Sequence, residues 1–260
     1  MLIRTRIDVI TELIKVEYNP MTGQTNRDVG VVLRTYKLKE ADRIVVFLTT
    51  SHGKIRGVAK GARKSGSKYS ARLEPGSVVD FQWICGNSEL VRITQVETVN
   101  SNRHIRENLD LFSSAQRMLE AVDILCEDNT AHEDLALMTI RALKAMNESK
   151  SSVTCGAFLF KVLSLEGFAP SVTTCFKCGS LNELNSFSIQ KGSFFCDDCA
   201  DPGCVLVLEH TRETIKAIFD GRLSSVVQSQ VSNTTKEVEA LAIAMIEYHT
   251  GKHLKSLMLV

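Results

Sequence analysis

The chain has no run of about 18 consecutive apolar residues, the length needed to cross a bilayer, so we expect no membrane-spanning helix. Its first 18 residues alternate charged and apolar side chains, and they lack the continuous apolar core and cleavage site of a secretory signal. Proline is scarce, and there is no internal repeat or low-complexity tract. These absences favour a cytoplasmic globular protein, and 260 residues suffice for two or three small domains.

Several enzyme motifs are also missing. No His-x-Glu is present, which excludes the zinc deaminase pattern, and there is no Gly-x-Ser-x-Gly elbow. The loop Gly61–Lys68 contains Gly-x4-Gly, but Ser67-Lys68 follows where a phosphate-binding loop needs Lys and then Ser or Thr. His249 and His253 are four residues apart, yet the glutamate of a metalloprotease helix is absent. We expect no catalytic residues; an unrecognised zinc hydrolase or nuclease is the remaining enzyme hypothesis.

Four of the eight cysteines form two Cys-x-x-Cys pairs, with the spacing Cys175-x2-Cys178-x17-Cys196-x2-Cys199. Each pair can place two thiolates on one ion, and two pairs complete a tetrahedral zinc site. Four thiolates leave no open coordination position, so we predict one structural Zn²⁺ ion. Free thiols or a redox pair are the alternative. Cys204 is either a spare ligand or, as we favour, a packing residue.

The insert between the two cysteine pairs has the pattern of a hairpin. Two short apolar runs, Phe187–Ile189 and Ser193–Phe195, flank Gln190-Lys-Gly192. This arrangement is typical of a zinc ribbon, and we assign residues 171–204 to it. A long chain without a secretory signal fits a reducing compartment with one metal site better than a disulfide framework.

The N-terminal residues differ from the rest of the chain. Residues 1–26 form a weakly amphipathic stretch that ends in the polar, turn-forming segment Asn19–Asn26. We expect either a disordered extension or residues that precede a true start at Met21.

From Asp28 onward the chain contains short runs rich in Val, Ile, Phe and Trp, separated by turns such as Ser51-His52-Gly53 and Pro75-Gly76. Within residues 27–100 these runs predict a small closed or partly open β-barrel. Phe47, Phe81 and Trp83 are expected to fill it. The predicted strands are Val29–Arg34, Arg43–Thr50, Lys54–Lys60, Val78–Ile84 and Glu89–Gln95.

After residue 100 the apolar period changes to that of helices, which we expect over residues 101–170 and 205–260. The segment Val153–Glu166 is apolar on nearly all sides, which predicts a central buried helix that ends before Gly167 and Pro170. The stripe Val238–Ile246 is either core or a groove for a partner peptide. Further helices are predicted over Ile105–Cys126, Glu133–Met146, Glu209–Phe219 and Thr234–Tyr248.

Positive charge is concentrated in one segment of the predicted barrel. Between Arg34 and Arg72 there are eleven Lys or Arg and only two acids, Glu40 and Asp42, so this segment carries +9 and the rest of the chain −8. Such an asymmetry favours a polyanion such as nucleic acid, although a solvated face is the usual reason for a charge run. The candidate DNA contacts are Arg34, Lys37, Lys39, Arg43, Lys54, Arg56, Lys60, Arg63, Lys64, Lys68 and Arg72.

Within this pool Lys54, Arg56, Lys60, Arg63 and Lys64 are the first candidates to track phosphates, while Tyr36 or Tyr69 could stack on bases. Which individual residues contact DNA is not fixed by the sequence.

These motifs resemble the RecO family of bacterial recombination mediators. The resemblance is carried by Val31–Val45, His52–Arg63 and Ala71–Pro75, and by the cysteine quartet and the closing His253–Leu257 in the same order. It runs from about Asp28 to Leu259 and leaves residues 1–26 unexplained.

The resemblance implies an α+β protein with an N-terminal five-stranded OB-fold barrel over residues 27–100, a helical domain and an inserted zinc ribbon. It also implies binding of single- and double-stranded DNA and annealing of complementary strands on nucleoid DNA. Implied partners are RecR, the C-terminal tail of single-stranded-DNA-binding protein and, indirectly, RecA during its loading. The alternative is an OB-fold and zinc-ribbon accessory factor of transcription or translation that binds RNA or a polymerase.

Overall fold

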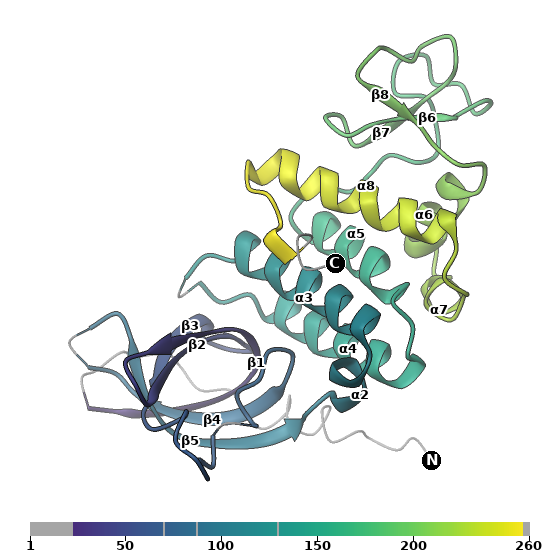
Figure 1. Cartoon of the computed structure of the whole chain (residues 1–260). Coiled ribbons are helices and arrows are strands. Elements are labelled where there is room, and N and C mark those ends of the chain that lie inside the picture. Colours follow the sequence, from purple (N-terminus) through teal and green to yellow (C-terminus); the bar gives the residue numbers. More distant parts are fainter. Residues whose placement is uncertain (1–22, 70, 87, 129, 257–260) are drawn as a thin grey trace, which may run out of the picture. The chain divides into compact units, whose positions relative to one another are not determined.

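The computed structural model describes residues 23–256 apart from residues 70, 87 and 129. The chain divides into two compact units (Figure 1). The first contains the residues up to Ser101 together with Cys126–Ile140, and the second contains the remainder. The proposed N-terminal extension lies outside the described residues as far as residue 22, whereas Thr25 and Asn26 belong to the first strand.

Five strands of the first unit close into a barrel in the order β1-β2-β3-β5-β4, and β4 pairs back onto β1. All neighbouring strands are antiparallel except β3 and β5, which are parallel. Closure pairs every strand on both sides and so removes exposed sheet edges. This connectivity confirms the predicted OB-fold barrel. Its strands are β1 (Thr25–Leu38), β2 (Asp42–Thr49), β3 (Gly53–Ala59), β4 (Val78–Ile84) and β5 (Val91–Asn100).

The long strand β1 pairs with both β4 and β2. Its first half pairs with β4 and its second half with β2, with a shift of register between Val32 and Arg34. A β-bulge of this kind increases the local twist and allows a barrel to close. Gly30 lies at a close approach of two strands, since a Cβ there would be 2.8 Å from the carbonyl oxygen of Leu48.

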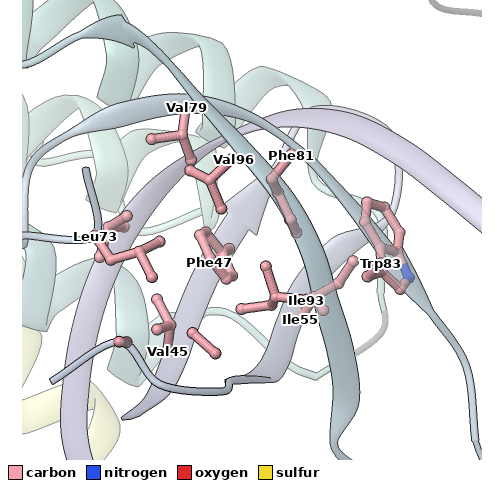
Figure 2. Packing of buried hydrophobic residues seen from close by; sticks show 12 residues of the cluster. Val45, Phe47, Ile55, Leu73, Val79, Phe81, Trp83, Ile93 and Val96 are labelled. Atoms are coloured by element: carbon pink, nitrogen blue, oxygen red, sulfur yellow. The ribbon is translucent and has the colours of Figure 1, made fainter. Parts of the chain in front are cut away.

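Large aromatic side chains fill the barrel, as predicted. The ring of Phe47 stacks on Phe81 with centroids 4.1 Å apart, and Phe81 stacks on Trp83 at 4.9 Å (Figure 2). All three are at most 1% exposed. Burial of each such side chain contributes about 1.5–3 kcal/mol, so this aromatic stack is a principal source of the stability of the barrel.

A buried carboxylate fixes the turn between β2 and β3. Asp28 on β1 accepts hydrogen bonds from the backbone N–H of Ser51, at 2.8 Å, and from the hydroxyl of Thr50. The Nδ1 atom of His52 lies 2.8 Å from the same carboxylate, and both side chains are fully buried. These bonds hold the turn against β1, and they thereby fix where β3 begins.

The second unit is helical, and α4 runs into it from the first. Its central helix α5 is buried on nearly all sides, as predicted, and contacts α3, α6, α7 and α8. The stripe Val238–Ile246 on α8 is core. The short helix α7 was not predicted. No helix in the described part of the chain is both long and apolar enough to cross a bilayer. The helices are α2 (Arg103–Glu107), α3 (Leu109–Leu125), α4 (Glu133–Ser149), α5 (Thr154–Leu165), α6 (Thr211–Phe219), α7 (Leu223–Val227) and α8 (Asn233–Thr250).

A small sheet is inserted between α5 and α6. The predicted hairpin is present as β6 (Ser186–Ser188) and β7 (Ser193–Phe195), and an unpredicted third strand, β8 (Cys204–Leu206), pairs with the other edge of β6. The rings of Phe187 and Phe194 meet across the hairpin at 4.9 Å and are fully buried. This core is small, and small domains of this kind are often stabilised by a bound metal ion or by cross-links.

Candidate nucleic-acid interface and metal centre

The exposed cations of the basic segment lie on two neighbouring parts of the barrel. The guanidinium of Arg63 donates to the carbonyl of Lys39 at 2.9 Å, and its backbone N–H donates to the carbonyl of Ala41 at 2.8 Å. These bonds hold the loop after β3 against the turn between β1 and β2. Apart from the ion-paired Arg56, six of the eleven candidates are exposed, and we call them the basic end of the barrel: Lys37, Lys39, Lys60, Arg63, Lys64 and Lys68.

Other members of the predicted pool are engaged within the fold. Arg43 pairs with Glu74 at 2.9 Å, and the guanidinium of Arg72 donates to the carbonyl of Val96 at 2.6 Å. Both side chains are partly buried. Their contacts tie β2 and β5 to the segment between β3 and β4. Both guanidinium groups would have to give up these contacts in order to bind a phosphate.

Lys54 and Arg56, two of the first candidates, both form ion pairs with Asp128, and we call these two cations the clamp. The Nζ atom of Lys54 lies 3.1 Å from one carboxylate oxygen of Asp128, and the Nε atom of Arg56 lies 3.0 Å from the other. The Lys54 side chain is only 6% exposed, whereas those of Arg56 and Asp128 are 50% and 42% exposed. The structure therefore places the charge of both cations against an internal carboxylate, a partner that sequence reasoning missed.

The two tyrosines proposed to stack on bases differ in their surroundings. Tyr36 is 46% exposed, and the guanidinium of Arg34 lies 6.0 Å from its ring centroid. Tyr69 instead donates its hydroxyl hydrogen to the carbonyl of Thr94 at 2.8 Å and packs against the barrel core. Tyr36 is therefore the better exposed candidate to stack on a base, with Arg34 beside it, whereas Tyr69 is mainly structural.

The four predicted ligand cysteines come together in the second unit. Their sulfur atoms all lie within 4.8 Å of one another, and the sulfurs of Cys178 and Cys196 are 3.7 Å apart. A tetrahedron with metal–sulfur bonds of about 2.3 Å has edges of about 3.8 Å, whereas a disulfide needs about 2.05 Å. The arrangement therefore fits one tetrahedrally coordinated metal ion. Cys204 is not part of this group.

The surroundings of the four cysteines favour the thiolate form of Cys175. Burial disfavours the thiolate of Cys175, but hydrogen bonds from the backbone N–H groups of Cys196, Cys178 and Lys177 outweigh it and lower its pKa to about 6. The hydrogen bond with Cys196, together with burial, raises the pKa of Cys199 to about 12. Burial also raises the pKa of Cys196. A bound cation must therefore displace protons from the cluster.

The two histidines near the C-terminus are held by other contacts. His249 stacks on Phe168 with ring centroids 4.1 Å apart, and burial lowers its pKa. The Nδ1 atom of His253 lies 3.1 Å from a carboxylate oxygen of Glu247. That carboxylate also accepts the backbone N–H of Leu254, so this part of the sequence anchors the C-terminal segment on α8.

Two family descriptions match consecutive parts of the chain. Residues 21–102 match "Recombination protein O N terminal", and residues 106–258 match "Recombination protein O C terminal". The chain belongs to the RecO family. RecO relatives named "DNA repair protein RecO" include those of Cutibacterium acnes, 32% identical over 91% of this chain and 98% of the relative, and of Streptomyces coelicolor, 35% identical over 89% and 96%. The relative from a Nocardioides species is 33% identical over 89% and 97%.

Membership of the RecO family supports a role in recombinational DNA repair. The closed barrel and the four-cysteine cluster agree with the resemblance seen in the sequence. Asp128 was not among the residues predicted for the interface, because it follows Arg56 by 72 positions and lies outside the basic segment.

Proposed function

We propose that this RecO-family protein binds single- and double-stranded DNA through the basic end of the barrel and anneals complementary strands. The observation that carries the proposal is the gathering of six exposed cations on a closed barrel within a chain whose net charge is only +1. The fixed loop of Arg63 holds part of this charge in place, which suits repeated contacts to a phosphate backbone.

Annealing follows from charge and needs no catalytic group. Two polyanionic strands repel one another, and a cationic surface that binds both screens this repulsion. Because contacts to phosphates leave the base edges free, the strands can pair while they are bound. The exposed ring of Tyr36 supplies a stacking platform for unpaired bases. The protein acts as a mediator and not as an enzyme.

The metal centre has a structural role in this proposal. Four thiolates complete the coordination of one Zn²⁺ ion and leave no position for a reacting water. Cys175, Cys178, Cys196 and Cys199 would hold the ion and close the loops on either side of the β6–β7 hairpin. The ion supplies the folding energy of the ribbon, and the annealing surface lies in another part of the chain.

The proposed partners follow from the family. RecR and the acidic tail of single-stranded-DNA-binding protein would bring this protein to DNA gaps in the nucleoid, and RecA would be loaded on the strand that they hold. The basic end offers charge that an acidic tail can pair with, and competition between the tail and DNA is then expected.

Strand annealing of complementary oligonucleotides tests the proposal. If all six exposed cations contact phosphates, the log–log salt slope for a single strand is about −4.2, at about 0.7 per contact. The double substitution Arg63→Glu and Lys64→Glu should make this slope shallower by about 1.4 and slow annealing. The matched control is Arg141→Glu with Lys236→Glu, which makes the same change of net charge at exposed residues of two helices.

Equal annealing rates for the two double variants would contradict the proposed surface. A protein that binds RNA of the same sequence and does not speed DNA annealing would instead belong to the accessory-factor class. Cleavage products in single-turnover incubations with excess protein and Zn²⁺ would indicate a nuclease.

A further inference from the structure

The clamp of Lys54 and Arg56 is built for a bidentate anion. One carboxylate oxygen of Asp128 lies 3.1 Å from Lys54 Nζ and 3.4 Å from Arg56 Nη2, and the other lies 3.0 Å from Arg56 Nε. Guanidinium groups bind carboxylates and phosphates through the same pair of parallel N–H donors. The position that Asp128 occupies can therefore be taken by two oxygens of a phosphate group.

Backbone contacts hold Asp128 beside β3. Asp128 forms a parallel bridge with Lys54, and Thr130 lies directly over the start of the strand. A Cβ at Gly53 would be 2.1 Å from the carbonyl oxygen of Thr130, and Gly53 has φ of +69°, so a glycine is needed there. The connection between α3 and α4 is thus seated on β3 by shape as well as by charge.

The two cations of the clamp differ in their exposure to solvent. The Lys54 side chain is 6% exposed, as expected for a cation that depends on its counter-ion. Arg56 and Asp128 are about half exposed, so a strand can reach the guanidinium from solvent. An ion pair of such exposure is worth at most about 1 kcal/mol, which a phosphate contact can replace.

We propose that Asp128 is an internal competitor for a phosphate-binding site formed by Lys54 and Arg56. The inference rests on the proposed function, because its ligand is the phosphate backbone of a DNA strand. In the free protein the carboxylate holds both cations. In the bound protein a phosphate takes the guanidinium first and then the ammonium, and Asp128 is released. The competitor lowers affinity, which favours release of annealed strands.

Asp128→Asn tests the competition, with Glu127→Gln as the matched control. Both variants lose one negative charge, at neighbouring exposed positions, but only Asp128 contacts the clamp. For a fluorescent oligothymidine, we expect Asp128→Asn to bind roughly three- to tenfold more tightly than Glu127→Gln. Its salt slope should be more negative by about 0.7 for one gained contact or about 1.4 for two.

Asp128→Asn is then made in a chain that also carries Lys54→Met and Arg56→Gln, which completes a double-mutant cycle. The excess gain of Asp128→Asn should disappear there, because no clamp remains to be released. Equal affinities and slopes for Asp128→Asn and Glu127→Gln would overturn the inference, as would a gain that persists without the clamp.

A measurement on the unmodified chain does not depend on how the variants fold. Saturating oligothymidine should increase amide hydrogen exchange at Asp128 and Thr130, and unchanged or slower exchange there would overturn the inference. The two proposals fail separately. If Arg63→Glu with Lys64→Glu still weakens binding while Asp128→Asn matches its control, the basic end stands and the competitor does not.

Discussion

Loading Zn²⁺ into the four-cysteine cluster must release protons, and the structure sets how many. At pH 7.5 Cys175, with a pKa of about 6, is already a thiolate. Cys199, with a pKa of about 12, and Cys196, with a raised pKa, are thiols. Because all ligands bind as thiolates, at least two protons leave per ion. Each proton makes the binding free energy change by about 1.36 kcal/mol per pH unit, so affinity should fall at least about 100-fold per unit of acidification.

Zn²⁺ affinity should fall as the pH falls, because protons compete with the metal ion for the thiolate ligands. Affinity is present above the pKa of each ligand and is lost as the pH falls through it, so below about pH 6 the protonation of Cys175 adds one more proton. The fall in affinity should then steepen by about a further tenfold per pH unit. Calorimetric titration with Zn²⁺ in buffers of different ionisation enthalpy counts the protons. Release of fewer than two protons at pH 7.5 would refute the reasoning, and Cys204→Ser is the control that should leave the count unchanged.

Two further substitutions test the interface and the core. Tyr36→Ala should weaken oligothymidine binding by about 1 kcal/mol, or about fivefold, because an exposed aromatic ring is lost. Tyr248→Ala removes a tyrosine of similar exposure in α8 and should not weaken binding. Equal effects of the two substitutions would show that Tyr36 does not stack on bases. Gly156→Ala should lower the free energy of unfolding by about 1 kcal/mol, because a Cβ would be 3.1 Å from the backbone of Glu239 and this crowding outweighs the gain of alanine over glycine within a helix. Denaturant titration compares it with Gly86→Ala, which has open space and should be neutral; a neutral Gly156→Ala would show that α5 and α8 can separate.

Local patterns in the sequence predicted much of the fold. The runs of Val, Ile and Phe between turns gave five strands, of which β4 was predicted with its exact ends, Val78 and Ile84. The all-round apolar segment Val153–Glu166 became the buried helix α5. These features depend on residues close together in the chain, and so their periodicity and turn chemistry are visible before the chain is folded.

Features that depend on distant partners were not predicted. The strand β8 has only three residues, and it is a strand because β6 offers it an edge. Tyr69 looked like an exposed aromatic in a basic loop, but a carbonyl on β5 holds its hydroxyl. The short helix α7 has five residues, too few for a helical period to be recognised.

The sequence by itself determined the four-cysteine motif and the basic segment, because a Cys-x-x-Cys pair and a run of like charge are defined by neighbouring residues. Only the tertiary structure decided which cations are open to a ligand. It buried Lys54, tied Arg43 and Arg72 to the fold, and brought Asp128 onto β3 from far along the chain. The physical reason is that charge is a property of the residue, whereas its availability depends on the partners that folding places beside it.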